Sequence, residues 1–153
     1  MPNWIEGTMK LRGKRENIKR FFEEGLEPSS WFGEKNKLDD QVKDESGDDH
    51  LEYSFKDEPH ICGTRRMFIT DSYASMWDEI GVCCFDIKQA WGFDAKELEK
   101  ISEKFNVDIR VYGIEMGMQF CEEILIENGK IIYDKEIKYD DWDWECPFPK
   151  MGG

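Results

Sequence analysis

The chain has 153 residues, enough for one domain with an ordinary hydrophobic core. Hydrophobic residues make up 39% and aromatic residues 14%, which excludes a disordered chain despite 36% charged residues. Thirty-four acids against 21 bases give a net charge of −13, and a surface of this sign repels nucleic-acid backbones and anionic membranes while attracting basic partners.

The first predicted elements are a strand over 4–12 and a helix over 15–25. Apolar and polar residues alternate along the strand. Ile18, Phe21 and Phe22 follow at helical spacing, and Gly25 is a suitable residue to end the helix.

The segment 27–59 shows no regular pattern apart from a short strand expected at Leu51–Phe55. Between Asp39 and Glu58 it holds nine acids and two lysines, a net charge of −7 before histidine. Irregular segments of this length inside a compact domain are usually functional or mobile. We therefore expect a partly ordered acidic insertion.

The middle of the chain predicts two more strands and a helix. A strand is expected over 60–69, then a linker around Asp71–Glu79, then a buried strand over 81–87 that begins at a glycine. Asp94 is expected to cap the next helix, with Glu97 three residues later. Its apolar stripe consists of Leu98, Ile101 and Phe105, and Asn106 ends it.

The last third predicts a strand over 107–112 and a β-hairpin. Residues 118–127 and 130–139 flank Asn128-Gly129, the pair of residues most typical of a tight hairpin turn. The segment 139–153 then alternates aromatic residues with carboxylates.

The order of these elements predicts an α+β fold. Strand–helix–strand occurs twice, which is the ferredoxin-like split βαβ plan (β-α-β-β-α-β), with helices on one face of an antiparallel sheet. The terminal hairpin would extend that sheet. A doubly wound parallel sheet needs more alternation of strands and helices. We expect a single domain over 1–153, with an acidic insertion at about 27–59 and an acidic, aromatic tail at about 139–153.

The N-terminal residues and the cysteines indicate a cytosolic protein. Met1-Pro2-Asn3-Trp4 lacks the basic and apolar regions of a signal peptide, and no window holds the ~18 apolar residues of a membrane span. Five cysteines are an odd number, and Cys83 is adjacent to Cys84, so we expect reduced thiols. In a strand these two neighbours would point to opposite faces.

Several short motifs resemble the YubB-type ferredoxin-like proteins of bacteriophages, plasmids and integrated elements. They are Asn3-Trp4 before the first strand, Ala90-Trp91-Gly92 before the second helix, the stretch 112–120, and the turn Glu127-Asn128-Gly129. The resemblance implies an origin in a mobile element and a location in the cytoplasm of a bacterial host. It implies no chemistry, and it covers neither the 27–59 insertion nor the tail.

Catalysis and metal binding find little support in the sequence. CxxC, HxH and HExxH spacings are absent, and the acidic loop lacks the calcium-binding register. His60 and Cys62 would share a strand face, so a Cys/His-dependent enzyme or small-molecule pocket there is one alternative. We otherwise expect neither a catalytic constellation nor a cofactor.

Nucleic-acid binding is a second alternative. Residues 1–20 carry six bases against two acids, a net charge of +4, and the candidate contacts are Lys14, Arg15, Lys19 and Arg20, in and just before the predicted helix. An open sheet can stack bases, but the basic, glycine-aromatic strand signature of RNA-binding sheets is absent. The helix is better explained as a solvated face that pairs with local acids, so nucleic acid is not the expected partner.

Binding to a host protein with a basic surface is the function that the sequence favours. The large aromatics of the tail are candidate anchors and the carboxylates would select the partner. We expect an anti-defence inhibitor, for example an anti-CRISPR protein, whose carboxylates stand in for phosphates. Two simpler explanations stay open, namely that the acidity only maintains solubility and that Trp142 and Trp144 share a strand face covering the sheet. The candidate residues are Asp39, Asp40, Asp44, Glu45, Asp48, Asp49, Asp140, Asp141, Trp142, Asp143, Trp144 and Glu145.

Overall fold

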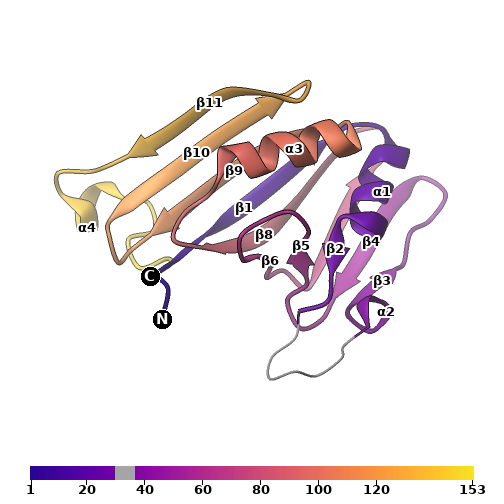
Figure 1. Cartoon of the computed structure of the whole chain (residues 1–153), viewed down its shortest axis with the longest axis horizontal. Helices are drawn as coiled ribbons and strands as arrows, with labels where there is room; N and C mark the ends of the chain where they lie inside the picture. The colour runs from indigo at the N-terminus through magenta and orange to yellow at the C-terminus, as the bar shows by residue number, and fades with distance from the viewer. Residues whose placement is uncertain (30–36) are drawn as a thin grey trace.

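The fold was obtained as a computed structural model, which describes residues 1–29 and 37–153 (Figure 1). Part of the predicted acidic insertion, residues 30–36, lies outside the described residues.

Most strands belong to one eight-stranded sheet, in which every pair of neighbouring strands is antiparallel. Two long helices, α1 (Arg15–Glu24) and α3 (Ala95–Phe105), lie on the same side of this sheet (Figure 1). The α+β class and the C-terminal hairpin are therefore confirmed. In order across the sheet the strands are β11 (Lys130–Ile137), β10 (Phe120–Glu127), β9 (Asp108–Glu115), β1 (Trp4–Arg12), β8 (Val82–Ala90), β6 (Met67–Ile69), β5 (His60–Ile61) and β2 (Leu26–Glu27).

A second, three-stranded sheet is built mainly by the segment predicted as an insertion. Its order is β3 (Val42–Asp44), β4 (His50–Phe55) and β7 (Tyr73–Trp77), and the short helix α2 (Leu38–Gln41) precedes β3. The strand expected at Leu51–Phe55 is confirmed as part of β4. β7 leads through a turn into β8, and these two strands lie against each other.

The cap residues of α3 and the turn residues of the hairpin are the ones that the sequence predicts. The Asp94 side chain accepts hydrogen bonds from the backbone N–H groups of Lys96 and Glu97, which would otherwise have no partner inside the helix. Asn106 ends α3 in the left-handed conformation. Asn128 and Gly129 have φ of 53° and 71°, the pair of positive values that a tight hairpin turn requires.

Two expectations for the middle of the chain are wrong. The strand over 60–69 is interrupted by a turn in which Gly63 and Arg66 have positive φ, so its ends pair with each other as β5 and β6. The linker at Asp71–Glu79 contains β7. Exposed and buried residues alternate along the five positions of this strand, and only Ala74 and Met76 face the core.

The main core lies between the large sheet, the two helices and the small sheet. Phe21 and Phe22 of α1 contact the rings of Phe85 in β8 and Tyr53 in β4, at centroid distances of 4.5–6.3 Å. Leu51 in β4 is 1% exposed. Burying a side chain of this size contributes about 1.5–3 kcal/mol. Leu51 and Tyr53, which belong to the segment predicted as an insertion, are therefore part of the main hydrophobic core.

The tail covers part of the other face of the large sheet. The short helix α4 (Trp142–Glu145) places Trp142 and the following Cys146 against Ile114 in β9 and Cys121 in β10. These side chains form a second, smaller core. Further along, the Gly153 N–H donates to the carbonyl of Trp4 at 2.8 Å. Among the described helices, none has the length and hydropathy needed to cross a membrane.

Candidate functional site

The outward side of the three-stranded sheet is rich in carboxylates. Because strand residues alternate, Leu51 and Tyr53 point into the core while Glu52 lies on the opposite side, and β7 alternates in the same way. The turns at the end of this sheet add further acids. We call this surface the acidic face, and it consists of Glu45, Asp48, Asp49, Glu52, Asp78 and Glu79 together with the exposed Tyr73, Trp77 and Ile80.

Arg15 of α1 holds together the two turns that carry most of these acids. Its guanidinium donates to both carboxylate oxygens of Asp78, at 3.1 and 2.9 Å, and to the carbonyl of Gly47 at 2.8 Å. The Asp78 N–H also donates to the carbonyl of Asp49 at 3.0 Å. The turn after β3 and the turn after β7 are thereby fixed side by side. The two contacts with Asp78 come from Nη1 and the contact with Gly47 comes from Nη2, so one guanidinium bridges the two turns.

Trp77 is the central apolar side chain of the acidic face. It is 53% exposed, and its ring centroid lies 5.2 Å from that of His50 on the neighbouring strand. Ile80, in the following turn, is 61% exposed. Both side chains line a surface hollow together with Asp48, Asp49, Asp78 and Glu79. The hollow therefore combines an apolar floor with carboxylates around it.

Local hydrogen bonds lower the pKa of two carboxylates in this region, Asp49 and Asp44. The pKa of Asp49 is lowered, first by the hydrogen bond with His50 at 2.9 Å. The pKa of Asp44 is also lowered, since partial burial, which raises it, is outweighed by hydrogen bonds from Ser46 and by the charges of Lys19 and Arg15. Of these two carboxylates, Asp49 belongs to the acidic face, whereas Asp44 lies near the cations of α1.

The predicted candidates of the insertion do not all lie together. Asp48, Asp49 and Glu45 belong to the acidic face, and Glu45 accepts a hydrogen bond from the Ser54 hydroxyl at 3.3 Å. Asp39 and Asp40 lie in α2, at the opposite end of β3 from the β3–β4 turn. Asp44, whose carboxylate lies near the charges of α1, is not on the outward side.

The candidates of the tail lie at the other end of the molecule (Figure 1). The expectation that Trp142 and Trp144 share a strand face is wrong, because they belong to α4. Trp142 is 5% exposed and its Nε1–H donates to the carbonyl of Pro149 at 2.9 Å, whereas Trp144 is 86% exposed. The exposed carboxylates around them are Asp140, Asp141, Asp143 and Glu145.

The sequence prediction missed the part of the acidic face that β7 and its turn provide. The sequence pattern places Tyr73 and Trp77 in a linker and Ile80 just after it, so it does not identify these side chains as anchors. The signal that identifies them is the alternation of Ala74 and Met76 with larger or polar neighbours, which indicates a half-buried strand.

His60 and Cys62 are not arranged as a catalytic pair. The His60 ring contacts the Glu27 carboxylate through Nδ1 and lies 3.0 Å from the Thr64 carbonyl through Nε2. Burial raises the pKa of the Cys62 thiol, and the charge of Glu27 acts in the same direction. A thiol in these surroundings is a poor nucleophile, because the thiolate is the reactive form.

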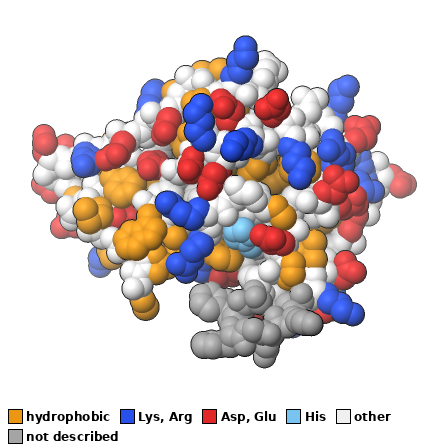
Figure 2. Space-filling model, in the orientation of Figure 1, with side chains coloured by type: hydrophobic (Ala, Val, Ile, Leu, Met, Phe, Trp, Pro, Cys, Tyr) orange, Lys and Arg blue, Asp and Glu red, His pale blue; other side chains and the backbone are white. Residues whose placement is uncertain are grey.

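The basic residues of α1 are engaged by acids of the same chain. Lys19 pairs with Glu23, and Arg20 pairs with Glu24 one helical turn later. Arg15 donates hydrogen bonds to Asp78 and to the Gly47 carbonyl, in the turns that carry the acidic face. On this side of the molecule, cationic and anionic side chains are interspersed over the helices (Figure 2). Such mixing offers a polyanion no continuous positive surface.

Within residues 1–29 and 37–153, no group of three or more His, Cys, Asp and Glu is arranged to hold a metal ion. Comparisons of the chain with protein-family models, with curated proteins and with solved structures find no match. The function is therefore argued from the acidic face and its chemistry.

Proposed function

We propose that this protein acts by binding another protein, and that the acidic face is its binding surface. The observation that carries the proposal is the hollow in which Trp77 and Ile80 stay exposed among four carboxylates. Large aromatic side chains supply much of the binding energy at protein interfaces, and they do so where neighbouring contacts exclude water. Trp77 has the exposure and the rigid support for this role.

The partner is proposed to be a host protein with a basic surface. The net charge of −13 speeds encounter with a positively charged partner and suppresses encounter with nucleic acid. The partner's lysine or arginine side chains would lay their apolar stems on Trp77 and Ile80 and place their charges at the carboxylates.

We further propose that the frame of the fold is the ferredoxin-like split βαβ plan. Support comes from the strand order β9-β1-β8-β6, in which β1 lies between β8 and β9 and every neighbouring pair is antiparallel. The hairpin β10–β11 and the small sheet would then be additions to this frame. This assignment, with the resemblance to YubB-type proteins, supports an origin in a phage or another mobile element.

For such an accessory protein, the proposed role is inhibition of a host defence factor in the bacterial cytoplasm. Defence nucleases bind nucleic acid in basic channels, where phosphate contacts supply much of the affinity. The ionised carboxylates of the acidic face would occupy such a channel in place of phosphates. Trp77 would add the apolar contact that phosphate groups lack.

Paired variants of the two acidic regions test this function. Asp48→Asn, Asp49→Asn and Glu79→Gln together remove three charges from the acidic face. Asp140→Asn, Asp141→Asn and Asp143→Asn remove the same charge from the tail. Trp77→Ala and Trp144→Ala form a second matched pair, since both side chains are largely exposed.

We expect the wild type and the tail variants to co-purify one basic host protein and to raise plaque counts on a host with active defence. The acidic-face variants should lose both effects, with a fall in affinity of at least about tenfold. Absence of a partner together with unchanged plaque counts would contradict the proposal. If only the tail variants lose binding, the binding site lies in the tail and not on the acidic face.

A further inference from the structure

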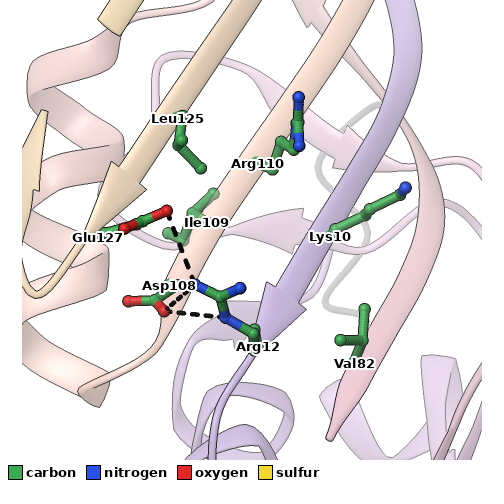
Figure 3. Close-up of a pocket in the computed structure, with 8 residues that line it drawn as sticks. All are labelled: Lys10, Arg12, Val82, Asp108, Ile109, Arg110, Leu125 and Glu127. Atoms are coloured by element: carbon green, nitrogen blue, oxygen red, sulfur yellow. Dashed lines mark hydrogen bonds and ion pairs between the residues drawn. The ribbon is translucent and has the colours of Figure 1, made fainter. Parts of the chain in front are cut away.

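A shallow depression lies on the face of the large sheet opposite the helices, away from the acidic face. Its volume is about 250 Å³, and residues of β1, β8, β9 and β10 line it. Figure 3 shows the side chains that surround it. They are Lys10, Arg12, Val82, Asp108, Ile109, Arg110, Leu125 and Glu127.

Two of these cations lie directly opposite each other on neighbouring strands. Lys10 of β1 and Arg110 of β9 are partners in the antiparallel register, and their side chains extend on the same side of the sheet (Figure 3). Like charges in directly opposed positions destabilise a sheet. Among the described residues, Lys10 has no carboxylate partner to offset this repulsion. In a chain with 34 acids the arrangement is unexpected.

The two arginines are held in place by carboxylates and keep donors unused. Arg12 donates from Nε and Nη2 to one oxygen of Asp108, at 3.1 and 2.8 Å, and Nη2 lies 3.7 Å from Glu127. Arg110 donates from Nη2 to Glu123 at 3.0 Å and to the Tyr133 hydroxyl at 3.1 Å. Each guanidinium has further N–H groups, and both are ordered before any ligand arrives.

The tail leaves this part of the sheet uncovered. Trp142 and Cys146 pack over Ile114 and Cys121, which lie further along β9 and β10. Besides the cations, the depression is lined by Asp108 and Glu127, which are paired with Arg12, and by the apolar side chains of Leu125 on one side and Val82 on the other. The depression can therefore hold a charged group and an adjoining carbon skeleton.

We propose that this depression binds a small phosphate-bearing molecule, with Lys10 as the main charge contact and the free N–H groups of Arg110 and Arg12 as hydrogen-bond donors. An anion between Lys10 and Arg110 converts a repulsive pair into two attractive contacts. Guanidinium groups suit tetrahedral oxyanions, because their planar N–H groups can donate in pairs.

The total charge favours a small ligand over a nucleic acid here. A long polyanion would meet the repulsion of a chain at −13, and its binding depends on many cations at once. One phosphate group needs only the local cations. The depression, of about 250 Å³, has room for a phosphate group and a few carbon atoms.

Thermal unfolding with added phosphate tests the site. At constant ionic strength, wild-type protein should be stabilised by inorganic phosphate over chloride, because a ligand that binds only the folded state raises Tm. In Lys10→Gln the affinity for phosphate, measured by calorimetric titration, should fall about tenfold. Without phosphate, this variant should unfold at the same temperature as the wild type or higher, since the repulsion of Arg110 is relieved.

Lys100→Gln is the matched control. Lys100 is an exposed residue of α3 without an ion pair in the described part of the chain, so its replacement changes the net charge equally. It should retain the phosphate effect in full. A comparison of glycerol 3-phosphate with inorganic phosphate distinguishes a phosphate ester from free phosphate as the ligand. A larger rise in Tm with the ester would indicate contacts between its carbon atoms and Leu125 or Val82. The proposal is overturned if phosphate stabilises the wild type no more than chloride does, or if Lys10→Gln binds phosphate as well as the wild type.

Discussion

The acidic segment around the β3–β4 turn and the acidic tail have similar compositions, yet they contribute differently to the molecule. In the first, the apolar residues Leu51 and Tyr53 are buried in the main core, and the carboxylates face outward around Trp77. In the second, a single large anchor, Trp142, is buried in a separate small core, and Trp144 projects into solvent.

This difference follows from the secondary structure that each segment forms. A strand alternates its side chains between two faces, so β4 and β7 present a continuous outer surface that neighbouring strands support. A helix of one turn, such as α4, buries one residue and exposes the rest. Two segments that both contain acids and aromatics therefore give a supported surface in one case and an anchored terminal segment in the other.

The largest effect is expected for Trp142→Ala. The substitution removes a buried indole and its hydrogen bond to the Pro149 carbonyl, and it should cost about 3–5 kcal/mol of unfolding free energy. Trp144→Ala should change stability by less than about 0.5 kcal/mol, because that side chain is exposed. Urea denaturation of both variants measures the difference. Similar losses in the two variants would show that α4 is packed differently from this description.

Leu51→Ala tests whether the insertion contributes to the main core. Leu51 is 1% exposed and belongs to the same hydrophobic cluster as Phe21 and Phe22, so we expect a loss of about 2–5 kcal/mol. Tyr73→Ala, on the outer side of the same small sheet, should cost much less because Tyr73 is 56% exposed. Urea denaturation again provides the measurement. If Leu51→Ala leaves stability unchanged, the three-stranded sheet does not support the rest of the fold.

Much of the fold could be predicted from local patterns, and the acidic face only in part. The helices, the hairpin at Asn128-Gly129 and strand β1 carry their own signals in alternation, caps and turn residues. In the small sheet only β4 is predicted, because β3 has three residues and the five-residue alternation of β7 lies between two turns, so both depend on pairing with β4. The role of Arg15 was missed for the same reason. Its partner Asp78 is 63 positions away in the chain, and spacing along a helix cannot reveal such a contact.

Glu122 and Glu123 are neighbours in β10, but their carboxylates lie on opposite sides of the sheet. Glu122 faces the helix side, where burial raises its pKa to about 7 and outweighs the hydrogen bond from the Phe93 N–H. The charges of Asp134, Glu136 and Asp94 raise it further. Glu123 faces the other side, and its hydrogen bond with Arg110 lowers its pKa.

Glu122→Gln is therefore expected to stabilise the protein at neutral pH. The folded-state pKa of Glu122 is raised from 4.5. Its contribution to the free energy of unfolding is therefore fully present below about pH 4.5 and is lost as the pH rises through 7. Glutamine can still accept from Phe93 without carrying a charge. Allowing for screening by solvent, the gain at pH 7.5 should be about 1 kcal/mol and should vanish near pH 4.5.

Glu123→Gln serves as the control with the opposite sign. The pKa of Glu123 is lowered in the folded state. Its contribution to the free energy of unfolding is therefore present above the pKa of the unfolded chain and is lost as the pH falls through the folded-state pKa. Replacement by glutamine should therefore reduce stability at pH 7.5 and have less effect in acid. Urea denaturation of both variants between pH 4 and 8 measures the two profiles. Parallel profiles for the two substitutions would show that the opposite surroundings of these neighbouring carboxylates do not control their ionisation.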